Sequence, residues 1–141
     1  MPYTLDATFA AGSRKKQIET EADIEEFISE LMDVARESSD HSVAWLCVNE
    51  RAKLPSGLVD HEILVGVDPA RAVSGFIFAD RSGGYYARGA HNPQGEVAYF
   101  SDGHHEEFPP DSEVPLSRVC DALREVLRTG ERPSDLVADN W

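Results

Sequence analysis

Apolar residues recur along the chain with two different periods, which divide it into strands and helices. Residues 3–9 alternate apolar and polar side chains, a period of two that predicts a half-buried strand. Residues 20–37 instead place apolar side chains at steps of three and four, which predicts an amphipathic helix. Thr20 and Asp23 have the spacing of a helix cap, so we expect the helix to begin there. Its apolar face comprises Ile24, Phe27, Ile28, Leu31, Val34 and Ala35.

Short apolar runs separated by turns follow this helix. We expect strands at 43–48, 61–67, 73–78, 85–88 and 96–100. Because no helical pattern lies between them, they predict an antiparallel meander. A second amphipathic helix is predicted over 116–128, with Pro115 at its start and Gly130 at its end, and Leu136 and Val137 could add an edge strand.

Together these elements predict one α+β domain over residues 1–141. We expect an antiparallel meander sheet of about five to seven strands with two amphipathic helices packed on one face. A chain of 141 residues with 41% hydrophobic and 28% charged residues is typical of a single folded domain. The longest apolar runs are too short to span a bilayer, and no signal-peptide pattern opens the chain, so the cytoplasm is the expected location. Cys47 and Cys120 are expected to be buried free thiols.

The formal net charge of −13 narrows the choice of partners. It argues against direct binding to nucleic acid, because that affinity depends on neutralising phosphates with Lys and Arg. It suits either plain solubility or electrostatic attraction to a basic partner. The polar face of the first helix is one acidic surface, with Glu26, Glu30 and Asp33 among its members, and a solvated helix face is the simpler interpretation.

Residues 97–116 hold the densest group of chemically capable side chains. They are Asp102, His104, His105, Glu106, Glu107, Asp111 and Glu113. A metal site is one interpretation, but adjacent histidines on an extended chain point to opposite sides and cannot easily bind one ion. A small metal- or ligand-dependent enzyme that uses the His104–Glu107 cluster is the alternative function. No nucleophile elbow or phosphate-binding loop accompanies the cluster, so we expect no cofactor and no catalysis.

Protein recognition is the third interpretation, and we favour it. Between Arg88 and Arg118 the chain has no Lys or Arg, and prolines stiffen the segment, which lowers the ordering cost of binding. We expect its acids to face outward and to contact a basic partner. The predicted contact residues are Asp102, His104, His105, Glu106, Glu107, Asp111 and Glu113, with the helix acids Glu26, Glu30 and Asp33 as the alternative surface.

Several of these segments resemble bacterial immunity proteins of polymorphic toxin systems, Imm family one, common in actinobacteria. The similarity is strongest in the motifs at 83–86, 97–100 and 103–109. It continues through 114–116, 122–125 and 129–133, and the opening strand followed by a Thr-capped helix is also similar. His105 departs from the family pattern, which often has an aromatic residue there, and Trp141 is a looser match to a terminal Trp.

The resemblance implies a non-enzymatic inhibitor of a cognate bacterial toxin, which in this family is often a nucleic-acid deaminase. The active site of a deaminase must accept a nucleic-acid strand, so we expect it to be lined with basic residues. An acidic inhibitor could occupy that groove, as the charge of −13 would favour. The sequence therefore predicts a protein partner, with neither nucleic acid nor membrane bound directly, and leaves the oligomeric state open.

Overall fold

Nine strands and two helices make up the described part of the chain, residues 2–139 of a computed structural model. The helices are α1 (Glu21–Glu37) and α2 (Leu116–Thr129). The strands are β1 (Leu5–Phe9), β2 (Arg14–Ile18), β3 (Val43–Val48), β4 (His61–Asp68), β5 (Val73–Asp80), β6 (Gly83–Tyr86), β7 (Val97–Ser101), β8 (His104–Phe108) and β9 (Val137–Ala138). Trp141 lies outside the described residues.

A seven-stranded antiparallel sheet is the centre of the fold, in the order β2-β1-β3-β4-β5-β6-β9. Strands β3 to β6 form the predicted meander, and the short β9 adds the expected edge strand beside β6. The basic segment Arg14–Ile18, which lacks the alternating apolar pattern of a strand, forms edge strand β2 and pairs with β1. The α+β class and the sheet size predicted from the sequence are confirmed.

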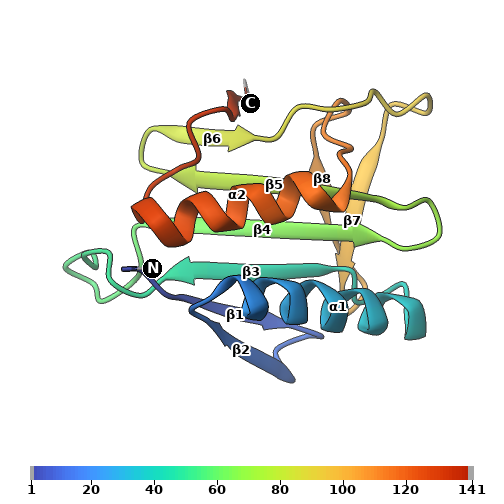
Figure 1. The fold of residues 1–141 in the computed structure, drawn as a ribbon. Helices are drawn as coiled ribbons and strands as arrows, with labels where there is room; N and C mark the ends of the chain where they lie inside the picture. The colour runs from blue at the N-terminus through green and yellow to red at the C-terminus, as the bar shows by residue number, and fades with distance from the viewer. Residues whose placement is uncertain (1, 140–141) are drawn as a thin grey trace.

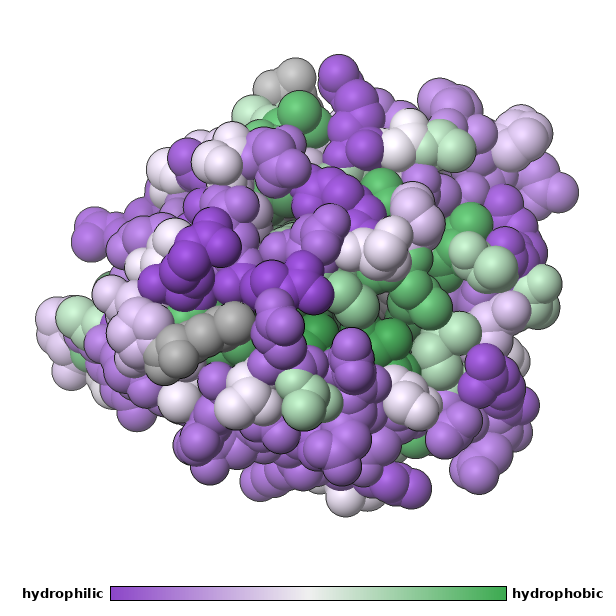
Figure 2. Space-filling model, viewed as in Figure 1, coloured by the Kyte–Doolittle hydropathy of each residue, from purple (hydrophilic) through white to green (hydrophobic). Residues whose placement is uncertain are grey.

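Both helices cover the same face of this sheet (Figure 1). Their buried apolar residues join those of β1, β3, β4 and β5 in the main core. Helix α1 begins at the predicted cap, where the Thr20 hydroxyl accepts a hydrogen bond from the Asp23 backbone N–H. Helix α2 ends at Gly130, whose φ of 69° suits a residue without a side chain. On this face apolar residues gather between the two helices, with hydrophilic residues around them (Figure 2).

A hairpin of β7 and β8 covers part of the opposite face, where it runs across the main strands (Figure 1). The sequence placed 96–100 in the main sheet, which is wrong, and residues 104–108, for which no strand was predicted, form its partner strand β8. The hairpin is stabilised because its apolar side chains pack against the sheet. Tyr99 and Phe108 join Val43, Leu64, Ile77, Tyr86 and Val97 in a second buried cluster.

Two glycines that pair across β4 and β5 form the seat of this hairpin. Gly66 lies opposite Gly75, and both backbones face the aromatic rings. A Cβ atom at Gly66 would lie 2.2 Å from Tyr99 Cδ2, and one at Gly75 would lie 2.7 Å from Phe108 Cδ2. The rings of Tyr99 and Phe108 also meet edge to face, with centroids 4.7 Å apart. The absence of side chains at Gly66 and Gly75 therefore allows the two rings to pack directly on the sheet and complete the second buried cluster.

Each described helix is too short or too polar to cross a membrane. The two cysteines are free and half-buried, Cys47 on β3 and Cys120 on α2.

The glycine seat can be tested by a double-mutant cycle. We expect Gly66→Ala to lower the free energy of unfolding by about 1–3 kcal/mol, because the new methyl group overlaps the Tyr99 ring. In a Tyr99→Ala background the same change should be neutral or stabilising, because alanine suits a strand better than glycine. Urea denaturation of the four proteins measures both values. Equal costs in the two backgrounds would show that the ring does not require the glycine.

Candidate functional site

The β7–β8 hairpin carries most of the predicted contact residues. Asp102 and Gly103 connect its strands, with φ of 48° and 81°, so a two-residue turn reverses the chain. Asp-Gly is favoured in such turns because both positions need a positive φ. Backbone hydrogen bonds from Ser42 N to Phe100 O and from Asp102 N to Asp40 O, each 2.8 Å, tie β7 to the segment after α1. The hairpin is thus held to the fold at its edge as well as over the glycines.

Alternation along β8 separates the side chains that the sequence placed together. His105 and Glu107 share the side that carries Phe100, and His105 Nε2 lies 3.5 Å from Glu107 Oε1. His104 and Glu106 lie on the other side, opposite Ser101 and Tyr99. Asp102, His104, His105 and Glu107 are exposed, and Glu106 is half-buried. The hairpin therefore presents its acids on two surfaces instead of gathering them in one centre.

No group of three or more His, Cys, Asp or Glu side chains within residues 2–139 is arranged to hold a metal ion. His91, which precedes the hairpin in the chain, is exposed and has its Nδ1 2.9 Å from the Asn92 carbonyl oxygen. The strand geometry of β8 gives the reason, because neighbouring residues on a strand point to opposite sides.

Glu113 is buried and Asp111 is half-buried, whereas the sequence led us to expect both to face outward. The Glu113 side chain is 5% exposed and accepts two hydrogen bonds from the Arg71 guanidinium, at 2.5 and 3.0 Å. Asp111 accepts hydrogen bonds from the Tyr86 hydroxyl at 2.7 Å and from Arg88 Nε at 3.0 Å.

Distant cations therefore neutralise both carboxylates. The Tyr86 hydroxyl, with help from Arg88, holds the pKa of Asp111 below its usual value. These two acids fasten the segment before α2 to the sheet, since Glu113 and Val114 also form backbone bridges to Ala90 and Ser74.

The alternative acidic surface on α1 is partly neutralised as well. Lys16 of β2 lies between Glu26 and Glu30, with Nζ 3.4 and 3.6 Å from their carboxylate oxygens. Asp33 is 3.0 Å from Arg36 one turn further along the helix. This surface retains less uncompensated charge than the hairpin.

A second feature, which the sequence did not reveal, is a groove of about 1170 Å³ on the sheet face away from the helices. Trp45 and Cys47 of β3 lie on its floor, and the loop between β3 and β4 forms a wall with Leu54 and Leu58. The Leu58 side chain is 68% exposed, the most exposed large apolar residue among those described. We call this hollow the open-face groove. Its only signals in the sequence are the apolar residues 58–59 within a polar loop.

Buried polar contacts hold the wall of the open-face groove in place. Arg51 donates to both carboxylate oxygens of Asp60, at 3.0 and 3.1 Å. Asp60 is also 2.8 Å from Nδ1 of the buried His61, whose Nε2 accepts a 2.8 Å hydrogen bond from the Val48 backbone N–H. The Arg51 guanidinium, followed by the His61 hydrogen bond, lowers the pKa of Asp60 from 3.8 to about 2.

The sequence of the chain matches the model of a known protein family. Residues 12–139 match the model described as Immunity protein Imm1. The chain belongs to the Imm1 immunity protein family. The resemblance found in the sequence is thereby confirmed at the level of the family. Membership suggests a toxin-neutralising, non-enzymatic role that is exercised by binding a toxin protein. No curated protein matches the chain.

The Asp60 contact predicts how stability should depend on pH. Because the folded pKa lies below the unfolded one, the pair stabilises the fold above pH 3.8, and this contribution is lost as the pH falls through about 2. At pH 7, Asp60→Asn should lower the free energy of unfolding by about 2 kcal/mol. Urea midpoints of wild type and variant, measured from pH 7 to pH 3, should move closer together, with the difference falling to roughly half at pH 3 because most of the loss occurs below that pH.

A control for this variant is Asp33→Asn, which breaks an exposed ion pair one turn apart on α1. Exposed pairs of this kind contribute little, so its effect should stay below about 0.5 kcal/mol. An Asp60→Asn loss that is the same at pH 7 and pH 3 would contradict the role given to the ionised carboxylate.

Proposed function

We propose that this Imm1 family member neutralises a cognate bacterial toxin by binding it with the acidic β7–β8 hairpin. The contact residues are Asp102, His104, His105, Glu106 and Glu107. The observation that carries the proposal is the state of the hairpin's carboxylates. Among the described residues, Asp102, Glu106 and Glu107 form no ion pair with Lys or Arg, whereas Asp111 and Glu113 do.

The charge of the whole molecule supports a basic partner. A net charge of −13 attracts cationic surfaces over distances of about a Debye length, and unpaired carboxylates at the contact sharpen that attraction. Asp111 and Glu113 act indirectly in this proposal, because their ion pairs position the segment that follows the hairpin.

The hairpin also offers an apolar contact among its charges. Phe100 is 38% exposed and lies beside His105, with ring centroids 6.4 Å apart. A hollow of about 450 Å³ adjoins it, between the end of α1 and the β4–β5 turn, with Arg36 and Pro69 among its lining residues. Exposed aromatic residues that enter or border a pocket often contribute most of the binding energy at an interface. Phe100 thus adds an apolar contact to the binding surface, which the carboxylates alone cannot provide.

The toxin we favour is a nucleic-acid deaminase that acts in the cytoplasm. Such an enzyme needs a basic groove for its substrate, and an acidic hairpin would compete with the nucleic acid for that groove. Blocking the groove requires no chemistry by the inhibitor, in agreement with the non-enzymatic role that the family suggests.

Charge reversal on the hairpin tests this function. The probe is the protein encoded by the gene next to this chain's gene, where the proposal expects the toxin domain. We expect Glu106→Lys with Glu107→Lys to weaken its binding by about tenfold or more, mainly through slower association, with a larger effect at low salt. Surface plasmon resonance at two salt concentrations measures both rates.

The matched control is Glu19→Lys with Glu25→Lys, which changes the net charge equally at the opposite end of α1 from the hairpin (Figure 1). A loss of affinity common to both pairs would mean that only total charge matters. A loss seen instead for reversal of Glu26, Glu30 and Asp33 would move the contact to α1. No binding by the wild type would contradict the proposed function itself.

A further inference from the structure

The open-face groove is lined by unpaired cations as well as by acids. Most Lys and Arg side chains are held in ion pairs or over an aromatic ring. Within residues 2–139, those with neither contact are Arg14, Lys15, Lys53, Arg81 and Arg128. Lys15 and Arg81 line the groove, and Lys53 belongs to the loop that forms its wall.

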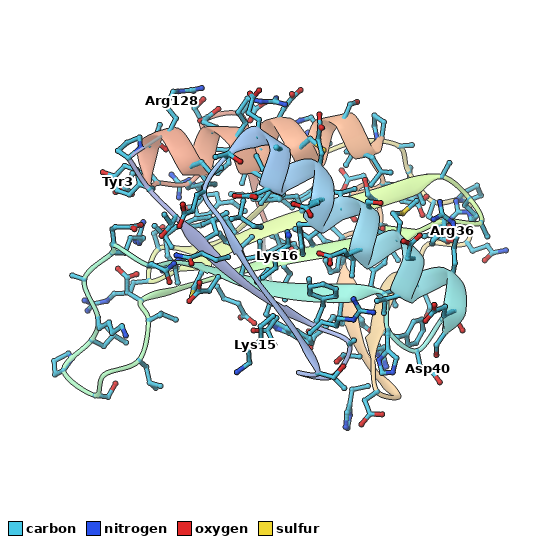
Figure 3. The ribbon with its side chains drawn as sticks, turned by 60° about the horizontal axis from the view of Figure 1, so that its bottom comes forward. Tyr3, Lys15, Lys16, Arg36, Asp40 and Arg128 are labelled. Atoms are coloured by element: carbon cyan, nitrogen blue, oxygen red, sulfur yellow. The ribbon has the colours of Figure 1, made fainter. Side chains whose placement is uncertain are left out.

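Lys15 reaches the groove because of its register on β2. It lies opposite Thr8, which lies opposite Trp45, and side chains of directly opposed residues share one face of a sheet. The neighbouring Lys16 points to the other face, where it meets the acids of α1 (Figure 3).

Lys53 lies close enough to Cys47 for its charge to act on that thiol. Burial raises the pKa of Cys47, and Asp6 adds to the rise, while Lys53 opposes it. Lys53 itself belongs to the loop that forms the groove wall.

Lys15 and Arg81 lie on different sides of the floor. Lys15 is on edge strand β2, and Arg81 follows β5, which is four strand positions away in the sheet. At the usual spacing of neighbouring strands this distance across the sheet is roughly 19 Å. Two acids, Asp6 and Glu62, also face the groove, and Asp6 accepts a hydrogen bond from Asn49 Nδ2 at 3.2 Å. The remaining acids of the lining, Asp60 and Asp80, are held by Arg51 and Ser82.

Apolar surface fills the space between these charges. Leu58 and Val59 are 68% and 39% exposed, and they are two of the three exposed large hydrophobic residues among those described. Trp45 is half-buried on the floor beside them. A solvent-exposed apolar hollow with a charged rim is typical of an interaction surface.

We infer that the open-face groove binds an apolar segment of the toxin that carries carboxylates at both ends, as a second contact besides the acidic hairpin. The apolar side chains cover Trp45 and Leu58, and the carboxylates pair with Lys15, Lys53 and Arg81. This inference rests on the proposed function. The groove and the hairpin occupy the same face of the sheet, so one toxin can reach both (Figure 3).

Charge selects this occupant over two others. A nucleic-acid strand would meet Asp6 and Glu62 on the floor and the charge of −13 around it. A second copy of the chain placed groove to groove would bring its Lys15 and Arg81 close to the Lys15 and Arg81 of the first copy, so like charges would face one another. A protein segment with carboxylates only at its ends can place them beside Lys15 and Arg81, and its apolar middle brings no negative charge onto Asp6 and Glu62.

Two variants of the full chain test the inference against the same toxin domain. Lys15→Glu with Arg81→Glu should weaken binding by about tenfold, because like charges then face the occupant's carboxylates. Leu58→Ser should weaken it several-fold through lost apolar contact, without loss of stability, because Leu58 is mostly exposed.

The control pair is Arg14→Glu with Arg128→Glu, which makes the same change of charge at two unpaired cations outside the groove. Arg14 is adjacent to Lys15 on β2 but lies opposite Phe9, on the helix face. We expect this pair to change affinity by less than about twofold. Isothermal titration calorimetry measures affinity for every variant, and circular dichroism confirms that each is folded.

Each outcome decides the inference. Groove variants that bind as well as the control pair would overturn it while leaving the hairpin proposal intact, and tighter binding by the reversal pair would overturn it as well. A wild-type dimer that Leu58→Ser dissociates would make the groove a contact between copies and would also overturn it. No toxin binding by the wild type would remove both proposals together.

Discussion

The contact of Tyr99 and Phe108 with the bare backbone of Gly66 and Gly75 decides how the rest of the molecule is arranged. A sheet with helices on one face leaves its other face in water unless something covers it, and here the hairpin covers part of that face. The aromatic rings can reach the sheet because the paired glycines present no Cβ atoms to them. The seat places the acidic turn at one end of that face and leaves the other end open as a groove.

Carboxylates in this chain have two different uses, and their partners separate them. Asp60, Asp111 and Glu113 accept hydrogen bonds from arginines that are distant in sequence or across a loop, and they fasten loops to the sheet. The exposed acids of the hairpin have no such cation beside them among the described residues. A charged side chain that already has its partner contributes little to a new interface, because pairing with another molecule would first have to break the existing contact. The unpaired carboxylates are therefore the ones available for recognition.

Lys and Arg side chains without an ion-pair partner are likewise available to bind another molecule. In a molecule of net charge −13, an unpaired Lys or Arg beside exposed apolar side chains is unusual enough to mark a surface. Lys15 and Arg81 lie on opposite sides of the open-face groove although they are 66 positions apart in the sequence. The combination of an acidic hairpin and a partly cationic groove on one face would let this immunity protein distinguish its own toxin from other basic proteins, because both patterns must match.

Periodicity alone was sufficient for the elements whose hydrophobic pattern is strong. Both helices, the meander and the cap at Thr20 followed from local rules, because apolar spacing and capping chemistry act between residues close in sequence. Asp102-Gly103 also carried a hairpin signal, and the acidic composition around it concealed strand β8. Arg71 and Arg88, by contrast, neutralise Glu113 and Asp111 only because the fold brings them there. Charge pairing across the sheet and the glycine seat depend on register and three-dimensional proximity, so the tertiary structure alone decided which acids stay exposed.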